Sequence, residues 1–294
     1  MIRGFEQVKD KYYKHTFSPV AKLTAVRFFI ALATAKNWPL HQLDINNAFL
    51  HGFIDEEVYM LPPEGYTKAV PGQVCKLVRS LYGLKQASRQ WNLELTKFLI
   101  SKGFKQSRSD YSLFSRESNR KYTHILVYVD DLLVSGDDEA SIAMIKQALH
   151  AAFTIKDIGL ARFFLGIEIS RSPMGTLLNQ RKYVLDILKD VGLTGAKPAR
   201  FPLPKGLKLS SELGELLPNP EAYKRIIGRL LYLTITRPDI SYVVQHLSQF
   251  LQHPRAPHYE AAIHVLRYLK GTPNKGLYYP RDNNLKLVAY CDAD

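Results

Sequence analysis

Residues 122–135 read YTHILVYVDDLLVS, two apolar runs that meet at a pair of adjacent aspartates. Runs rich in β-branched and aromatic residues favour strands, so we expect strands at 122–128 and 132–135, joined through Val129-Asp130-Asp131. Two neighbouring carboxylates repel each other, and neither can be buried fully without a partner. Either the pair marks a solvent-exposed turn, where Asp is common, or a divalent cation removes the repulsion.

A third carboxylate, Asp44, ends another short strand that we expect at residues 40–45. Mg²⁺ prefers oxygen ligands and keeps several waters and substrate phosphates, so two or three protein carboxylates are enough to bind it. By its own pattern Asp44 is equally well explained as a strand-end residue. The sequence around Asp44 is needed to distinguish a metal ligand from an ordinary strand-end residue.

The rest of the chain mixes helices and strands in runs, which favours an α+β fold over a regular βαβ alternation. Helices are expected at residues 20–33, 87–102, 136–153, 182–191, 221–234, 240–252 and 258–269, the first of them capped by Ser18 and Pro19. Further strands are expected at residues 58–60, 74–78, 163–170, 276–279 and 285–290. Residues 197–220 are proline-rich and lack periodicity, which predicts a linker.

The composition is that of a folded protein, and its positive charge suggests a polyanionic partner. The 294 residues are 46% hydrophobic and 23% charged, enough for two or three packed subdomains. A formal net charge of +13 favours a nucleic acid as partner, because each neutralised phosphate releases counterions. A basic surface without a partner is the plain alternative.

The cysteine content and the hydropathy of the chain indicate the cellular compartment of the protein. Cys75 and Cys291 lie far apart without a CxxC pattern, so neither a disulfide framework nor a structural zinc site is expected. The most apolar stretch, residues 23–35, contains Arg27 and is too short to span a bilayer. No signal peptide opens the chain. We therefore expect an intracellular protein of the cytoplasm or nucleus that makes no contact with a membrane.

The chain resembles the copia-type (Pseudoviridae-like) retrotransposon reverse transcriptases in an ordered series of motifs. These are QLDINNAFLHG at 42–52, EVYM at 57–60, LYGLKQASRQW at 81–91, DYSLF at 110–114, YVDD at 128–131, FLGIEI at 164–169, RPDI at 237–240 and RYLKGT at 267–272. A single YVDD would be a weak signal, whereas this succession covers essentially the whole chain. The resemblance therefore favours the cation over the bare turn.

The resemblance implies an α+β fold built as a right-hand polymerase. Residues 1–195 would form incomplete fingers and the palm with its YVDD hairpin, and residues 196–220 a linker. A helical thumb or connection region would span 221–275, and a truncated RNase H-like domain would begin at 276–294. The implied activity is an RNA-directed DNA polymerase that uses dNTPs and a primed RNA or DNA template.

The resemblance also assigns the metal ligands. Asp44 and Asp130 would hold two Mg²⁺ ions, or Mn²⁺ in their place, with Asp131 in support and the Ile45 carbonyl as a further ligand. One ion would lower the pKa of the primer 3′-hydroxyl, and the other would stabilise the triphosphate and the leaving pyrophosphate.

Two residues would contact the incoming nucleotide. Phe49 corresponds to the aromatic steric gate that excludes a ribose 2′-hydroxyl, although an ordinary core Phe would fit the same pattern. Gln86 lies in the segment 83–88 that resembles the contact to template and nucleotide, and that segment also reads as a helix N-terminus.

The remaining assignments concern the primer. Tyr128 and Val129 would flank the primer terminus, and Phe164, Leu165 and Gly166 resemble the primer-grip hairpin. Lys156 precedes that hairpin as the protonating lysine does in related polymerases, which would make it a general acid. A solvent-facing lysine is the ordinary alternative.

The chain departs from the family pattern at three places. It opens near the end of a fingers strand, so the basic residues that grip the triphosphate would be missing. Phe53 stands where the family often has Asp or Asn. Asp292 lies in what resembles the first strand of an RNase H domain and could not form a nuclease by itself.

Two other function classes remain for comparison. The first is a catalytically inactive remnant that folds and at most binds nucleic acid. The second, a His-based or zinc hydrolase, has little support, because His253, His258 and His264 lie on or next to expected helices without a Cys or carboxylate ligand pattern.

Overall fold

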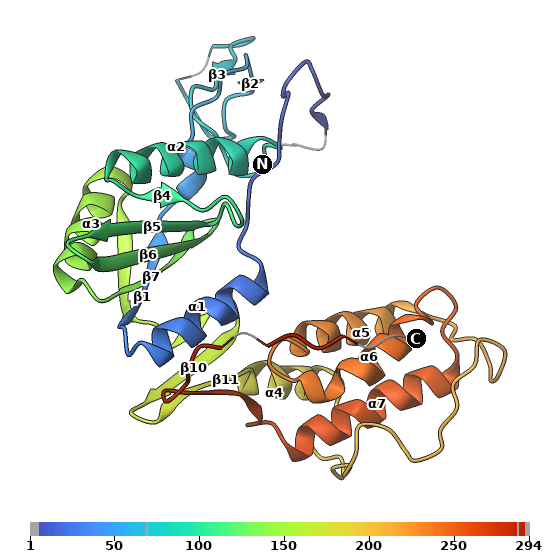
Figure 1. Cartoon of the computed structure of the whole chain (residues 1–294). Helices are drawn as coiled ribbons and strands as arrows, with labels where there is room; N and C mark the ends of the chain where they lie inside the picture. Colours follow the sequence, from blue (N-terminus) through green and yellow to red (C-terminus); the bar gives the residue numbers. More distant parts are fainter. Residues whose placement is uncertain (1–5, 69, 287, 292–294) are drawn as a thin grey trace. The chain divides into compact units, whose positions relative to one another are not determined.

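The computed structural model describes residues 6–68, 70–286 and 288–291 (Figure 1). The chain divides into two compact units, Met1–Ala161 and Arg162–Asp294. Within the described residues, no helix is long and apolar enough to cross a membrane. The fold is a mixture of helices and antiparallel sheets, which confirms the predicted α+β class.

The first unit is built on a six-stranded antiparallel sheet. In spatial order its strands are β4 (Lys105–Gln106), β5 (Leu113–Ser118), β6 (Lys121–Tyr128), β7 (Asp131–Gly136), β1 (Leu40–Ile45) and β8 (Ile155–Leu160). β6 and β7 form the predicted hairpin around Val129 and Asp130. β1 therefore joins the sheet next to β7, although a long stretch of chain separates the two strands.

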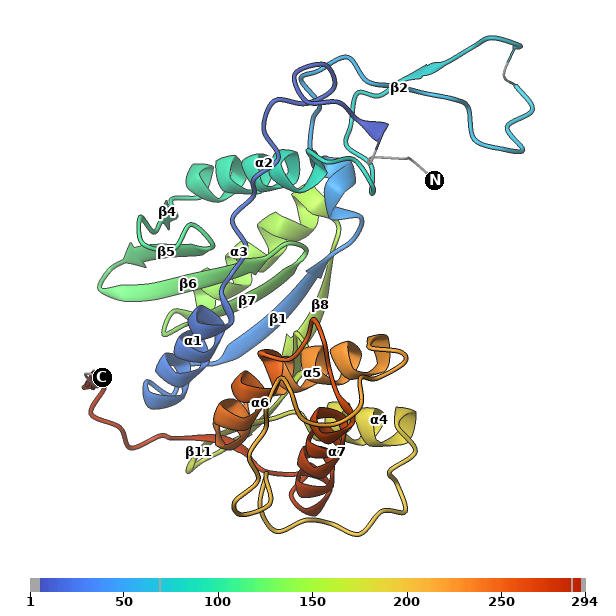
Figure 2. The same cartoon turned by 90° about the vertical axis from the view of Figure 1, so that its right-hand side faces the viewer.

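Two helices cover one face of this sheet, α2 (Ala87–Ser101) and α3 (Glu139–Phe153) (Figure 2). Their apolar side chains and those of the central strands form one buried cluster: Leu43, Ile45, Trp91, Leu95, Leu99, Phe104, Phe114, Ile125, Val127, Leu132, Val134, Ile142, Ile145, Leu149, Phe153 and Ile155. Burial of this size is the main driving force for the fold. The cluster also fixes the strand ends that carry the aspartates.

The first helix, α1 (Leu23–Ala35), starts later than its sequence pattern suggests. Its N-cap is Lys22, which has an extended backbone and no side-chain cap, so the predicted cap at Ser18 was wrong. The preceding segment is extended instead, and the Phe17 carbonyl accepts a hydrogen bond from Arg89 on α2 at 3.3 Å. Tertiary contacts here override a good local capping signal.

A small hairpin projects from the first unit, formed by β2 (Tyr59–Met60) and β3 (Cys75–Lys76). Both strands were predicted, in longer form. An exposed ion pair between Lys76 and Glu57, 2.7 Å apart, lies at its base. The 3-10 helix η2 (Ala48–His51) connects β1 to this part of the chain.

The second unit combines a four-stranded sheet with a helical core. The sheet order is β12 (Gly276–Pro280), β11 (Gly175–Asn179), β10 (Ile167–Ser172) and β9 (Phe163–Phe164). The helices are α4 (Arg181–Asp190), α5 (Glu221–Leu233), α6 (Ser241–Ser248) and α7 (Ala256–Gly271), with the 3-10 turn η3 (Pro238–Ile240) before α6. Residues 197–220, the predicted linker, contain no helix or strand and lie within the second unit.

Several boundaries differ from those expected. The units divide after Ala161 rather than after residue 195, because β9–β11 and α4 pack within the second unit. The strand expected at 163–170 is broken into β9 and β10 by Leu165 and Gly166, both with positive φ.

The end of the chain differs as well. β12 pairs with β11 in the second unit's own sheet, so residues 276–280 do not open a separate layer there. No strand forms in the described part of 285–290, and Asp292 and residues 1–5 lie outside the described residues.

Candidate active site

Asp44 lies at the centre of a row of charged side chains across three strands. In the antiparallel pairing it is opposite Asp131 on β7 and opposite Lys156 on β8. Directly paired residues point to the same face, with Cβ atoms about 4.5–5.5 Å apart. The sheet therefore places Asp44, Asp131 and Lys156 side by side in register, although they come from distant parts of the sequence.

Asp130 lies beside this row, at the tip of the β6–β7 hairpin. Tyr128 pairs with Asp131, so Val129 and Asp130 form a two-residue loop, and the Asp130 side chain is exposed. The backbone N–H of Ile45 donates to the Asp130 carbonyl oxygen at 2.9 Å, which ties the loop to the end of β1. The loop carrying Asp130 is thus attached directly next to Asp44.

Val129 has an unusual backbone conformation, with φ of 56°. Two-residue hairpins of the primed types require a positive φ at the first loop position, where Gly or Asn is usual. A β-branched residue there costs about 1–3 kcal/mol and persists only when its surroundings hold it. The indole N–H of Trp91 donates to the Val129 carbonyl at 2.7 Å and provides one such support.

Burial and neighbouring like charges both act on the carboxylates of the site. Burial, together with the neighbouring Asp130 and Asp44, raises the pKa of the Asp131 carboxyl, while a hydrogen bond from the Gln42 amide at 3.4 Å lowers it. A divalent cation would relieve this repulsion, and the donor set of carboxylates suits a hard ion such as Mg²⁺.

The predicted metal ligands are close in the fold but are not arranged as a finished metal site. In the part of the chain that the structure describes, no group of three or more His, Cys, Asp or Glu side chains is arranged to hold a metal ion. The set of Asp44, Ile45, Asp130 and Asp131 therefore stays a prediction.

Comparison with known proteins gives the family. Residues 1–205 match the family described as reverse transcriptase (RNA-dependent DNA polymerase). The chain belongs to the reverse transcriptase family. Enzymes of this family generally use divalent metal ions.

Several relatives belong to copia-type retrotransposons. The chain is 44% identical over 295 residues to the retrovirus-related Pol polyprotein from transposon RE1 of Arabidopsis thaliana, and 38% identical over 307 residues to that from transposon TNT 1-94 of Nicotiana tabacum. It covers 20% and 23% of the lengths of these polyproteins. A transposon Ty5-1 protein of Saccharomyces cerevisiae is 35% identical over 254 residues, which is 85% of this chain and 82% of that protein.

Phe49, the steric-gate residue by resemblance to reverse transcriptases, lies at the border between core and surface. Its half-buried ring contacts the cluster beneath the sheet and stacks on Tyr82, with centroids 5.8 Å apart and planes at 30°. Tyr82 is 82% exposed. The position suits either a pocket wall or a core residue, so the assignment stays a prediction.

Gln86, the other predicted nucleotide contact, is fully buried. Its amide donates to the Tyr12 carbonyl at 2.9 Å and its oxygen accepts from the Gln7 amide at 3.0 Å. Both polar groups are thus used within the protein in this conformation. Gln86 is the N-cap residue of α2, which agrees with the alternative interpretation as a helix N-terminus.

Lys156 is exposed on the edge strand β8, next to Asp44 in register. Sequence reasoning had placed no strand at 155–160. The pairing places Lys156 in register with a predicted metal ligand, and its role as general acid stays a prediction.

The predicted primer-grip residues lie in the second unit. Phe164 is buried, and Leu165 and Gly166 form the turn between β9 and β10. The Tyr232 hydroxyl donates to the Leu165 carbonyl, which fixes this turn against α5.

Phe53, the departure from the family pattern, has a partner in the structure. The Arg79 guanidinium lies 3.8 Å from the centre of its ring and also donates to the His51 carbonyl at 2.9 Å. The aromatic ring thus takes part in closing the loop after η2.

Sequence reasoning missed two residues next to the aspartates. Gln42 lies two positions before Asp44 on the same strand, and side chains at that spacing share a face. Trp91 lay within the LYGLKQASRQW motif without an assigned role. A polar residue at alternate spacing could have indicated Gln42, whereas only the tertiary structure could identify the partner of Trp91.

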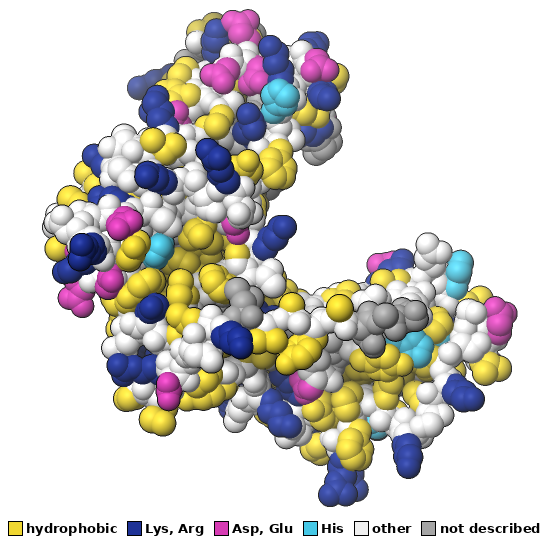
Figure 3. Space-filling view, in the orientation of Figure 1, with side chains coloured by type: hydrophobic (Ala, Val, Ile, Leu, Met, Phe, Trp, Pro, Cys, Tyr) yellow, Lys and Arg dark blue, Asp and Glu magenta, His cyan; other side chains and the backbone are white. Residues whose placement is uncertain are grey.

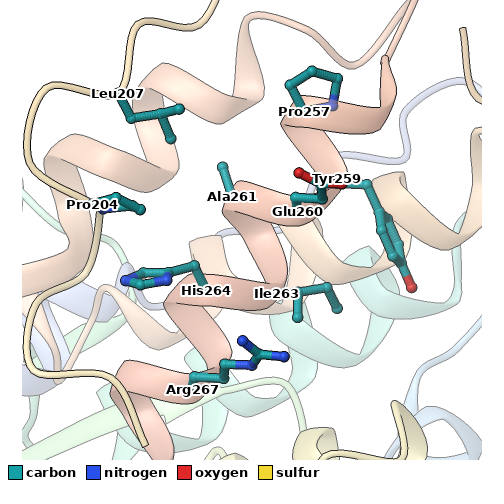
Figure 4. A pocket seen from close by; sticks show the side chains of 9 residues that line it. All are labelled: Pro204, Leu207, Pro257, Tyr259, Glu260, Ala261, Ile263, His264 and Arg267. Atoms are coloured by element: carbon teal, nitrogen blue, oxygen red, sulfur yellow. The ribbon is translucent and has the colours of Figure 1, made fainter. Parts of the chain in front are cut away.

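Basic side chains and a pocket are found outside the site. Lys and Arg side chains are spread over the face in Figure 3, in agreement with the net charge of +13. A pocket of about 480 Å³ lies between α7 and the linker in the second unit (Figure 4). Its lining contains one carboxylate, that of Glu260.

Proposed function

We propose that the chain is an RNA-directed DNA polymerase that transfers a nucleotide from a dNTP to the 3′-hydroxyl of a primer on an RNA or DNA template. The observation that carries this proposal is the strand register that pairs Asp44 with Asp131, beside the tied loop of Asp130. The family match supports the same chemistry.

In this proposal Asp44 and Asp130 hold two Mg²⁺ ions, and Asp131 and the Ile45 carbonyl complete the ligand set. When bound, the ions lower the pKa of the attacking hydroxyl and neutralise charge on the triphosphate. Carboxylates that repel one another in the free protein lose that repulsion on loading. Positioning of the reactants then supplies most of the rate enhancement.

The side chains around the aspartates have supporting roles. Tyr128 and Val129 flank the primer terminus, and Phe49 with its stacking partner Tyr82 lines the sugar side of the nucleotide pocket. Lys156, in register with Asp44, donates a proton to the leaving pyrophosphate.

In this proposal the two units correspond to different subdomains of a polymerase. The sheet of the first unit acts as the palm, with the β2–β3 hairpin as part of the fingers, and helices α5–α7 act as the thumb or connection region. The basic composition supports a primed template as partner, bound with an affinity that falls steeply with salt.

Primer extension on poly(rA)/oligo(dT) with Mg²⁺ tests the proposal. The wild-type chain extends the primer, and Asp44→Asn lowers the rate by at least about 10³-fold, because residues of one catalytic unit fail together. Asp186→Asn, the same change at an exposed position on α4, is the matched control and leaves extension unchanged. Extension that survives in Asp44→Asn, or none by the wild type, contradicts the proposal.

A further inference from the structure

Trp91 connects helix α2 to the YVDD turn. Its side chain is 1% exposed, and its indole N–H donates to the Val129 carbonyl at 2.7 Å. The acceptor belongs to the residue with the left-handed backbone, directly before Asp130. The bond therefore acts on the peptide that leads into a predicted metal ligand.

The indole ring has a fixed orientation of its own. Phe153, the last residue of α3, packs edge-on against it at a centroid distance of 5.2 Å and an angle of 90°. His51 of η2 lies 5.8 Å away at an angle of 49°. Aromatic neighbours from two other elements thus hold the ring so that its N–H points at the turn.

The same part of α2 also contacts the loop that follows Asp44. A Cβ atom added at Gly52 would lie 2.7 Å from the Trp91 backbone nitrogen and 2.8 Å from the Gln90 carbonyl carbon. The chain after η2 therefore packs directly on the helix backbone. The Trp91 backbone thus lies against Gly52, on the chain that follows Asp44 and η2. The Trp91 side chain binds the loop formed by Val129 and Asp130.

A positive φ at a β-branched residue needs such a restraint. Without it, Val129 would relax toward the ordinary negative-φ region, a gain of about 1–3 kcal/mol, and the Asp130 side chain would move with it. A buried hydrogen bond contributes about 0.5–1.5 kcal/mol, comparable to this strain.

We propose that Trp91 is a positioning residue of this active site, which holds the YVDD turn in its left-handed conformation and thereby sets Asp130 relative to Asp44. The kinetic part of this inference rests on the proposed polymerase function, whereas the metal-binding part does not. Loss of the indole N–H weakens divalent-metal binding and slows the chemical step, while primer–template binding stays the same.

Trp91→Phe tests this proposal because it keeps an aromatic ring and removes the donor. We expect kcat to fall about tenfold, with KM for dNTP and the Kd for primer–template changed less than twofold. Titration with Mn²⁺, followed by electron paramagnetic resonance without substrate, should show several-fold weaker binding. Trp38→Phe, the matched change at the only other tryptophan, leaves all these quantities unchanged.

A second substitution separates positioning from packing. Gly adopts a positive φ without steric cost, so Val129→Gly removes the need for the restraint. Trp91→Phe should then weaken Mn²⁺ binding by less than twofold when measured in the Val129→Gly background. Equal losses in both backgrounds would show that the indole acts through packing and would overturn the proposal.

The hydrogen bond can also be measured in the unsubstituted site, which covers the case that Trp91→Phe does not fold. Trp38→Phe leaves Trp91 as the one indole in the chain, so its N–H signal is assigned without ambiguity. Slow exchange of that proton with solvent supports the proposal, and exchange at the rate of a free indole overturns it.

If the wild type binds Mn²⁺ as expected but extends no primer, the polymerase function fails while the positioning role stands.

Discussion

Asp131 lies opposite Asp44 on the neighbouring strand and next to Asp130, in a half-buried position on the sheet. Burial and these two like charges raise the pKa of its carboxyl above the ordinary value of 3.8. The folded, metal-free protein therefore binds the Asp131 proton more tightly than the unfolded chain does. The stabilisation from this proton is complete below the ordinary carboxyl pKa and is lost as the pH rises through the folded-state pKa.

Asp131→Asn consequently raises the free energy of unfolding of the metal-free protein at about pH 7. The difference from wild type should shrink as the pH falls toward the ordinary value of 3.8. Denaturant unfolding in EDTA across this range measures it, with Asp186→Asn as the control. A variant that is no more stable than wild type at neutral pH would show that the like charges do not strain the fold.

Phe49 allows a test of the nucleotide pocket at a single residue. If its ring blocks the ribose 2′-hydroxyl, Phe49→Ala increases ribonucleotide incorporation relative to deoxyribonucleotide by at least about tenfold, because the pocket gains space on the sugar side. Competitive single-nucleotide incorporation measures this ratio. An unchanged preference in an active variant would assign Phe49 to the core alone.

The residue types at the site could be predicted from the sequence, but their contacts could not. Asp44, Asp130 and Asp131 could be recognised because carboxylates at the ends of apolar strands are costly unless a partner or a cation neutralises them. The hydrogen bond from Trp91 and the internal use of Gln86 depend on how α2 packs, and no local pattern encodes that packing.

At the scale of elements, the chain after η2 packs closely on the backbone of α2. Gly52 makes this contact possible, since a Cβ atom there would lie 2.7 Å from the Trp91 backbone nitrogen. Gly52→Ala should cost about 1–3 kcal/mol of stability, because backbone atoms cannot move aside as a flexible side chain can.

Thermal and denaturant unfolding of Gly52→Ala measure this cost, and the Mn²⁺ affinity should fall with it. Gly195→Ala is the control, because nothing lies within 4 Å of a Cβ atom added there. If Gly52→Ala has the stability of Gly195→Ala, the loop and the helix are not in the close contact described.

The elements with strong apolar periodicity were predictable, and the strands that depend on pairing were not. The β6–β7 hairpin and α2–α5 formed close to their expected bounds. β8 was missed because most of its residues are exposed and it contains Gly159, so its own sequence does not favour a strand. It exists through pairing with β1, and β-propensity reflects such context more than the residues themselves.

At the scale of the whole molecule, each unit has a core of its own. The helices of the second unit bury a separate apolar cluster, to which α4 contributes Val184, Ile187 and Leu188. The proline-rich segment 197–220 looked like a domain boundary, yet it lies within this unit. Composition revealed an irregular segment, whereas the division between the units follows from packing.

Arg237 shows how the second unit is held together. It is 1% exposed, forms two hydrogen bonds with the Asp239 carboxylate at 2.9 and 2.8 Å, and donates to the Thr272 carbonyl at 2.8 Å. These bonds join the start of η3 to Thr272, the C-cap residue of α7. Asp239 also accepts from Tyr268, and these hydrogen bonds outweigh burial and lower the pKa of its carboxyl.

Arg237→Met should destabilise the second unit by about 2–3 kcal/mol, because the charged hydrogen bonds of Arg237 are lost and the Asp239 carboxylate loses one of its hydrogen-bond partners. Hydrogen exchange followed by mass spectrometry should show faster exchange within 162–294 and unchanged exchange within 1–161. Arg225→Met, at an exposed position on α5, is the control. Equal acceleration in both units would mean that they do not unfold separately.

We propose that the sheet joins Asp44 and Asp130 into a single metal-dependent catalytic unit. A double-mutant cycle in single-nucleotide incorporation tests it most directly, with Asp44→Asn, Asp130→Asn and the double variant compared under one set of conditions. If Asp44 and Asp130 act together, either aspartate alone contributes little to the rate once the other is lost. Each single variant should therefore lose nearly as much activity as the double variant. Losses that multiply independently, or a single variant that keeps its activity, would contradict the account.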